Sequence, residues 1–371
     1  MKMIFHVLSI PLYPTSKEIT VCPFTQKVYK FCKSMTERGH TVFHYGHPDS
    51  EVVCTKHFSV ISRETYDKTY GNQTWREYHN QNIQNSAHDE FNDNAAKLIK
   101  QNKQTHNDFV FAFWGIGHRN CLEKLVNDFI LVEPSIGYDS ACGQYRVFET
   151  YAQMHKLQFK IHDSGTGCFT DAVIPPGFYL DDFEFKKEKQ DYILYLGRMI
   201  DAKGLQIAQD LSIASKTPIK FVGPQNQENS LNKNNPLAEY IHTVSYEERK
   251  SLLANAKALI LPPLYMEPCG WAMIEAFFSG TPVISTDWGG PSEYIKQGVT
   301  GYRCRSLNEF YHALKNIHKI NPQDCRDYAE QNFHINKAAT AYENYCQHIL
   351  DIRQYGFGFV KESCNFLVPE V

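Results

Sequence analysis

Two glutamates, Glu267 and Glu275, with seven residues between them, flank a glycine where a helix is expected to begin. The apolar run Ala258–Leu261 and a Pro-Pro pair precede them, so the order is strand, loop, glutamate, glycine, helix, glutamate. A helix start offers backbone N–H groups to an anion, and carboxylates accept hydrogen bonds from sugar hydroxyls. The segment therefore suits a small polyhydroxy ligand that carries a phosphate. Taken alone, it fits equally well a capped core helix whose carboxylates face solvent.

A second segment places two cations after an expected strand. The strand ends at Gly197, and Arg198 and Lys203 follow five residues apart in a loop that ends at Gly204. Parallel α/β domains bind ligands at the carboxyl ends of their strands. An arginine can bind a diphosphate through two parallel hydrogen bonds, and a lysine adds a point charge. The spacing indicates a diphosphate site, although two such cations in isolation are more often surface residues.

A third segment ends a buried strand in a pair of glycines. The strand Pro282–Thr286 is followed by Gly289, Gly290 and then Glu293. Glycines at such a turn allow close approach of the backbone or a positive φ. Because this strand comes directly after the helix that carries Glu275, we expect the two loops to be neighbours.

The three segments together resemble the C-terminal domain of the retaining glycosyltransferases of family 4, which have the GT-B fold. The family pattern is Gly-Arg-x4-Lys-Gly, then Glu-x7-Glu, then Gly-x-Pro-Val-Ile, Gly-Gly and Glu, and this chain has all of it in order. Ile174-Pro-Pro-Gly177 stands where the family has a Pro-Asn-Gly hinge turn. The resemblance spans about residues 173–332 and implies an α/β fold of two Rossmann-like domains that face each other across a cleft.

The resemblance also implies roles for residues of the second half. Arg198 and Lys203 would bind the donor diphosphate, Glu267 would contact the donor sugar, and Glu275 would hold the nucleotide ribose. Backbone N–H groups at the helix start would face the sugar and phosphate, and they belong to Cys269, Gly270, Trp271 and Ala272. The family often has Gly-Phe-Gly where this chain has Pro-Cys-Gly, so the sugar is not predicted.

The first half resembles the family less closely. The family has a strand end, usually with a histidine, that touches the donor sugar near the reacting carbon, and His118 is the candidate here. A lone histidine in a loop is more often structural. The next strand ends at Glu133 and Tyr138, which we expect to meet the acceptor. Arg146 and Glu149 are expected to form a structural pair on the following helix.

The reaction that the resemblance implies is transfer of a sugar, with retention, from a nucleotide diphosphate sugar to a hydroxyl of a glycan, a lipid or another acceptor. We expect no cofactor and no catalytic metal, because Asp181-Asp182 follows the hinge turn and is interpreted as linker. Two alternatives stay open. One is a nucleotide-sugar epimerase of the same fold, which needs no acceptor. The other is a non-catalytic protein that binds a nucleotide sugar.

Composition limits the classes of partner. A net charge of −3 gives no field that favours nucleic acid or an anionic membrane. The eleven cysteines include no C-x-x-C pair and predict reduced thiols in a cytoplasmic protein. The apolar start Met1–Leu8 is too short for a signal peptide and predicts a strand. Peripheral membrane contact through the basic residues of helix Thr25–Arg38 is the less favoured interpretation of an amphipathic surface helix.

Strands alternate with helices in both halves, which predicts two parallel α/β domains. We expect an acceptor-side domain over residues 1–173, a nucleotide-sugar-binding domain over 174–335, and a helix with a tail over 336–371 that crosses back to the first domain. Residues 62–94 are expected to be loops and irregular helix. The expected helices include Thr25–Arg38, Tyr145–Leu157, Gly204–Ser215, Tyr246–Ala256 with a capping box from Ser245 and Glu248, Gly270–Ser279 and Leu307–His318.

Overall fold

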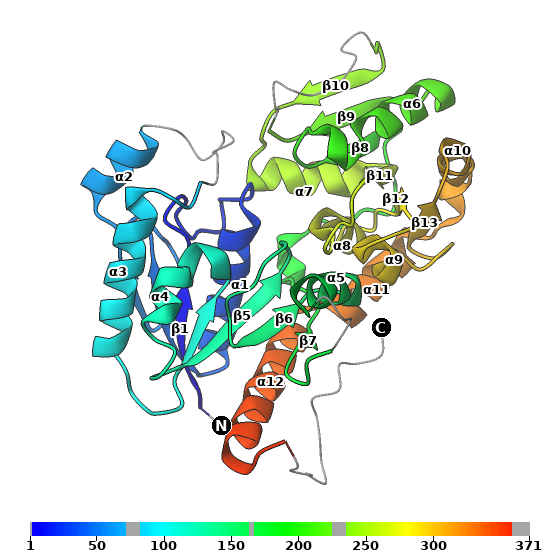
Figure 1. Ribbon diagram of the computed structural model, residues 1–371. Coiled ribbons are helices and arrows are strands. Elements are labelled where there is room, and N and C mark those ends of the chain that lie inside the picture. Colours follow the sequence, from blue (N-terminus) through cyan, green and yellow to red (C-terminus); the bar gives the residue numbers. More distant parts are fainter. Residues whose placement is uncertain (1, 72–81, 163–166, 225–234, 358–371) are drawn as a thin grey trace. The chain divides into compact units, whose positions relative to one another are not determined.

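The computed structural model describes residues 2–71, 82–162, 167–224 and 235–357 (Figure 1). The chain forms two compact units. Among the described residues, the first unit holds 2–71, 82–162 and 167–177 together with 335–357. The second unit holds 178–224 and 235–334. Each unit is a parallel sheet with helices on its faces.

The sheet of the first unit has seven parallel strands in the order β3-β2-β1-β4-β5-β6-β7. The strands other than the edge strand β3 are almost continuously buried, as expected for parallel strands covered on both faces, whereas β3 is partly exposed. The strands are β1 (Ile4–Leu8), β2 (Thr41–Gly46), β3 (Lys56–Ser59), β4 (Phe109–Ala112), β5 (Ile130–Ile136), β6 (Tyr145–Phe148) and β7 (Ala172–Val173).

Helices cover both faces of this sheet. On one face, Phe31 of α1 and Tyr342 of α12 pack with Phe111 of β4. On the other face, Phe91 of α3 and Leu122 of α4 belong to a separate apolar cluster. The helices of the first unit are α1 (Pro23–Glu37), α2 (Arg63–Tyr70), α3 (Ser86–Gln101), the 3-10 turn η1 (Gly115–His118), α4 (Arg119–Glu123), α5 (Tyr151–His162) and α12 (Ile335–Tyr355).

The sheet of the second unit has six parallel strands in the order β10-β9-β8-β11-β12-β13. The strands are β8 (Ile193–Leu196), β9 (Ile219–Val222), β10 (Ala238–Ile241), β11 (Ala258–Leu261), β12 (Val283–Thr286) and β13 (Gly301–Cys304). The helical segments are η2 (Leu180–Asp182), η3 (Asp201–Lys203), α6 (Leu205–Ser215), α7 (Tyr246–Asn255), α8 (Trp271–Phe278), α9 (Gly290–Tyr294), α10 (Leu307–Asn316), η4 (Ile317–Lys319) and α11 (Pro322–Phe333).

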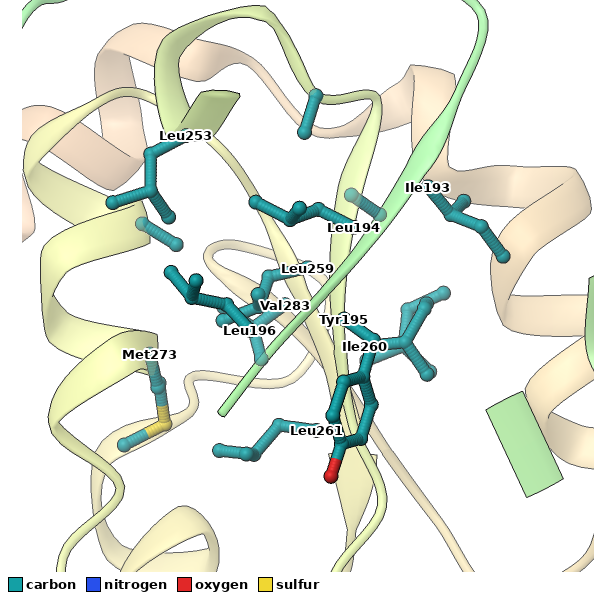
Figure 2. Packing of buried hydrophobic residues seen from close by; sticks show 14 of the residues in the cluster. Ile193, Leu194, Tyr195, Leu196, Leu253, Leu259, Ile260, Leu261, Met273 and Val283 are labelled. Carbon is teal, nitrogen blue, oxygen red and sulfur yellow. The ribbon is translucent and has the colours of Figure 1, made fainter. Parts of the chain in front are cut away.

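One apolar core fixes the position of α7 and α8 against the sheet of the second unit. Leu253 of α7 and Met273 of α8 are in the same buried cluster as Leu196 of β8 and Leu261 of β11. Figure 2 shows Leu253 and Met273 on the side of the sheet toward which Leu196 points. This packing holds the loops after β8 and β11 on a rigid base.

The strand order of each sheet reverses once. In the second unit the chain goes from β8 outward to β9 and β10, and then returns to the other side of β8 with β11. The loops after β8 and β11 therefore diverge at a topological switch point, which is where open α/β sheets bind ligands.

Several predicted elements are confirmed, among them the helix now bounded as α1, the strand β11 and the capping box of α7, in which Ser245 and Glu248 cap each other. The helix predicted over Tyr145–Leu157 is wrong in its first part, because Tyr145–Phe148 forms β6 between β5 and β7. A short apolar run does not distinguish a strand from a buried helix by its period. Residues 62–94, predicted irregular, include two regular helices, α2 and the start of α3, and residues 72–81 lie outside the described part.

Candidate functional site

The loops after β8, β11 and β12 meet at one edge of the second sheet. The backbone N–H of Leu264, after β11, donates to the carbonyl of Ala202, after β8, at 2.8 Å. The N–H of Gly290, after β12, donates to the carbonyl of Glu267 at 2.8 Å. The predicted proximity of the glycine pair to the glutamate loop is confirmed, and the three sequence segments form one cluster.

Glycine is required where these loops touch. Gly204 has φ +73°, and a Cβ there would lie 1.9 Å from the carbonyl oxygen of Pro262. Gly289 has φ +65°, and a Cβ there would lie 2.7 Å from the carbonyl oxygen of Glu267. Both positions combine a left-handed backbone with a contact too close for any side chain. The glycines therefore bring Lys203 and Glu267 within reach of each other.

A hydrogen-bonded group forms around the carboxylate of Glu267. Lys203 Nζ lies 3.0 Å from Glu267 Oε2, and the Tyr265 hydroxyl donates to the same oxygen at 2.5 Å. Trp288 Nε1 donates to the Tyr265 carbonyl at 3.1 Å. Burial and the neighbouring charge of Glu267 raise the pKa of Tyr265 above its usual range, so the phenol stays a neutral donor. The carboxylate is thus held in one place before any ligand binds.

Glu275 is held by a residue that the sequence patterns did not single out. Arg249 of α7 donates to Glu275 Oε2 from Nε at 3.1 Å and from Nη2 at a shorter distance. The two side chains are 22% and 14% exposed, so the ion pair is largely screened from water. Arg249 lies in the first turn of α7 and carries no motif of its own. No sequence signal connects it to Glu275.

Arg198 and Lys203 occupy the loop that follows β8. The carbonyl of Arg198 accepts a hydrogen bond from the Tyr195 hydroxyl at 2.9 Å, which ties its backbone to the end of the strand. The side chain of Arg198 is exposed, whereas that of Lys203 is partly buried. One cation is therefore presented to solvent at the strand end, and the other is fixed beside Glu267.

The residues at the start of α8 offer backbone rather than side chains. Gly270 has φ +86° and precedes the first helical residue, Trp271. Cys269 is 2% exposed and lies against Gly290, and Trp271 packs edge-to-face on Phe178 with ring centroids 5.0 Å apart. The first N–H groups of a helix have no partner within the helix. This end of α8, at Cys269, Gly270, Trp271 and Ala272, is thus suited to an anion.

The structure places His118 in the core of the first unit. Its side chain is 0% exposed, and its ring stacks on Phe91 of α3 with centroids 5.3 Å apart. Burial lowers the pKa of His118 to about 3, so the ring is neutral near pH 7. The η1 turn directs this ring onto α3. The placement favours a structural role over the expected contact with the donor sugar.

Glu133 and Tyr138 bind each other and nearby backbone. The Tyr138 hydroxyl donates to Glu133 Oε1 at 2.5 Å, and the N–H groups of Cys142 and Gly143 donate to Oε2 at 2.6 Å each. The Tyr138 hydroxyl also accepts from the N–H of Gly115 at 2.8 Å. Glu133 is 0% exposed, and burial raises its pKa. This cluster holds two loops together, so the expected acceptor contact gives way to a structural role.

Two further expectations in the first unit are corrected. Arg146 lies on β6 and pairs with Asp171, with its Nε 2.7 Å from Oδ1, and not with Glu149. Glu149 pairs instead with Lys27 at 3.2 Å. Of the four basic residues on which membrane contact was considered, Lys27 and Lys30 are buried, Lys33 pairs with Glu37 and Arg38 pairs with Glu343.

Among the described residues, no group of three or more His, Cys, Asp or Glu side chains is arranged to hold a metal ion. Asp182 of the Asp-Asp pair accepts a hydrogen bond from the Tyr246 hydroxyl at 2.7 Å. No helix in the described ranges is both long and apolar enough to cross a membrane. The described cysteines form no disulfide.

The second unit matches a known family of proteins. Residues 180–331 match the model of the family described as "Glycosyl transferases group 1". Over 79 residues the chain is 34% identical to an alpha-1,3/1,6-mannosyltransferase ALG2 of Dictyostelium discoideum, and the match covers 21% of this chain and 19% of that protein. The chain thus covers about a fifth of the length of this curated relative.

Solved structures resemble the whole described architecture. The glycosyltransferase AviGT4 of avilamycin A biosynthesis superposes with a TM-score of 0.68 at 17% identity, covering 94% of this chain and 98% of that one. The Anabaena protein HepE, solved in complex with UDP and glucose, superposes with a TM-score of 0.64 at 12% identity, covering 93% of this chain and 100% of the other. Likeness at this identity shows the fold, and it confirms the two Rossmann-like domains of the GT-B class.

Proposed function

Because residues 180–331 belong to the group 1 glycosyl transferases, we propose that this chain transfers a sugar from a nucleotide diphosphate sugar to an acceptor hydroxyl. The observation that carries the proposal is the contact of Lys203 with Glu267 at the switch point of the second sheet, where Arg198 lies in the same loop as Lys203 and Glu275 lies on the helix that follows the Glu267 loop. Cations for a diphosphate and carboxylates for hydroxyl groups then stand beside the start of α8.

Each residue has a part in the proposed reaction. Arg198 and Lys203 bind the diphosphate, Glu267 binds hydroxyls of the donor sugar, and Glu275 binds the ribose. As the bond to the sugar breaks, negative charge develops on the leaving phosphate. Arg198, Lys203 and the N-terminus of α8 stabilise that charge because they are already in position. Retention at the sugar carbon and independence of metal are part of this proposal.

Lys203 serves both carboxylate and phosphate in this scheme. Its ammonium has three N–H donors, and its bond to Glu267 at 3.0 Å uses one of them. The remaining donors are available to a phosphate oxygen. The pairing holds the Glu267 carboxylate beside the sugar and keeps the lysine near the diphosphate. The acceptor would be a glycan or a lipid, and no acceptor role is assigned to the buried Glu133.

The first experiment is a thermal-shift screen with UDP, GDP and ADP and with their sugars, since a ligand that binds the folded state raises the unfolding temperature. The nucleotide sugar that binds is then incubated with the protein, with and without a panel of acceptor sugars. The proposal expects nucleoside diphosphate release that increases with an acceptor. A lack of stabilisation by every nucleotide contradicts it, and an isomerised sugar nucleotide without acceptor identifies an epimerase instead.

The variant Arg198→Ala tests the assignment of residues. We expect turnover to fall by about 100-fold or more, as for loss of a group that stabilises transition-state charge. Its exposed side chain makes a folded variant the expected outcome. Lys220→Ala is the control, because Lys220 lies on β9 in a partly exposed pair with Glu239. Turnover of Arg198→Ala near that of the control overturns the assignment.

A further inference from the structure

Arg249 reaches from the first turn of α7 to Glu275 in the middle of α8, across 26 residues of sequence. We propose that Arg249 is a positioning residue that fixes the Glu275 carboxylate for recognition of the nucleotide ribose. The inference rests on the proposed function and extends it to a residue outside the family motifs. Arg249 acts through Glu275 and does not itself bind the nucleotide.

The geometry of the pair carries this inference. Nε and Nη2 of Arg249 both donate to one oxygen, Oε2. Both bonds end on the same oxygen, so they fix the position of Oε2 and leave Oε1 out of the contact with Arg249. A carboxylate that is anchored at one oxygen has less conformational freedom to lose when its other oxygen accepts from a ribose hydroxyl.

The surroundings of Glu275 explain why a cation is needed. Tyr246 opens α7 and donates to Asp182, and burial raises the pKa of its phenol, as do the negative charges of Asp182, Glu247 and Glu275. Three carboxylates therefore act on the same phenol. Arg249, one turn along the helix from Ser245, supplies the positive charge that balances this region. The ion pair is 14–22% exposed, so water screens it only in part.

A direct role for Arg249 predicts a different pattern of affinities. If the guanidinium left Glu275 to bind phosphate, its loss would weaken every nucleotide that has the same phosphates. If Arg249 only positions Glu275, its loss would weaken nucleotides that have ribose hydroxyls and spare those that lack them. The ratio of the two affinities separates these roles.

The experiment measures the dissociation constants of uridine diphosphate and 2′,3′-dideoxyuridine diphosphate by calorimetry, or the guanosine or adenosine pair if the screen selects that base. The proteins are the full chain, Arg249→Met, Arg249→Lys and the control Lys250→Met. Lys250 is the next residue of α7 and pairs with the exposed Glu247, so its loss removes a cation from the same helix.

We expect the full chain and Lys250→Met to prefer the ribonucleotide by about tenfold or more, as for a hydrogen bond to a charged group. In Arg249→Met the preference should fall to about twofold or less, with the affinity for the dideoxynucleotide unchanged. Arg249→Lys should retain an intermediate preference, and it keeps the test decisive if the methionine variant does not fold. Equal weakening of both nucleotides, or an undiminished preference, overturns the inference. Failure of the full chain to bind either nucleotide instead contradicts the proposed function.

Discussion

Lys203 Nζ lies 3.0 Å from Glu267 Oε2, although 64 residues separate the two side chains. The contact joins the loop after β8 to the loop after β11, and it forms because Gly204 lets the first loop approach the carbonyl of Pro262. Cation and carboxylate are therefore paired within the second unit. Because both groups are already positioned, binding of a ligand requires less ordering of these side chains.

The Tyr265 hydroxyl is the second donor to Glu267 Oε2, at 2.5 Å, and its removal tests how far this carboxylate must be held. We expect Tyr265→Phe to lower turnover of the nucleotide sugar by about tenfold, because a hydrogen bond to a charged group contributes about 1.5–3 kcal/mol. Binding of the nucleoside diphosphate alone should not change, because that ligand lacks the donor sugar that Glu267 is proposed to contact. Steady-state kinetics and calorimetry measure the two quantities. An equal decrease in turnover and in affinity for the nucleoside diphosphate would show that Tyr265 supports the loop as a whole.

Gly204 and Gly298 provide a matched pair for testing the contact between loops. Both have a positive φ, at +73° and +75°, but a Cβ at Gly204 would lie 1.9 Å from Pro262 O, whereas one at Gly298 would meet no atom within 4 Å. We expect Gly298→Ala to cost about 1 kcal/mol of unfolding free energy from backbone strain alone. Gly204→Ala should cost about 2 kcal/mol more and reduce nucleotide binding, since the loop must move. Chemical denaturation gives both values, and similar costs for the two variants would contradict the need for this close approach.

Acid should destabilise the first unit through its buried histidines. Burial lowers the pKa of His44 to about 3, with a contribution from His57, and lowers that of His118 to about 3. The unfolded chain has histidine pKa values near 6.5, so below that pH the unfolded state binds protons that the folded state does not. These histidines therefore do not lower the free energy of unfolding above about pH 6.5. They lower it progressively as the pH decreases from 6.5 toward 3.

At pH 5 each of these histidines should cost about 2 kcal/mol of unfolding free energy relative to pH 7. Urea denaturation at a series of pH values measures the total. In His118→Phe, which keeps an aromatic ring against Phe91, the decrease between pH 7 and pH 5 should be smaller by about 2 kcal/mol. An identical pH dependence in the variant would show that protonation of His118 does not lower the free energy of unfolding.

The sequence by itself determined most of the elements and the motif positions of the second unit. Ala258–Leu261 is recognisable as a buried strand from its apolar run, and the Ser245 and Glu248 capping box marks the start of α7. These features depend on residues close together in the chain. The order of the three motifs was also enough to predict the family match over residues 180–331.

Only the tertiary structure decided which side chains are partners. Arg249 meets Glu275 because α7 and α8 pack on the same core, and Glu133 is enclosed by backbone N–H groups of a loop that no pattern assigned to it. His118 was a candidate for chemistry by its position after a strand, yet a single 3-10 turn directs its ring into the core. Local spacing fixes where a side chain leaves the backbone. Its environment depends on how distant elements pack, and that packing is settled by the burial of the whole apolar surface and not by any one segment.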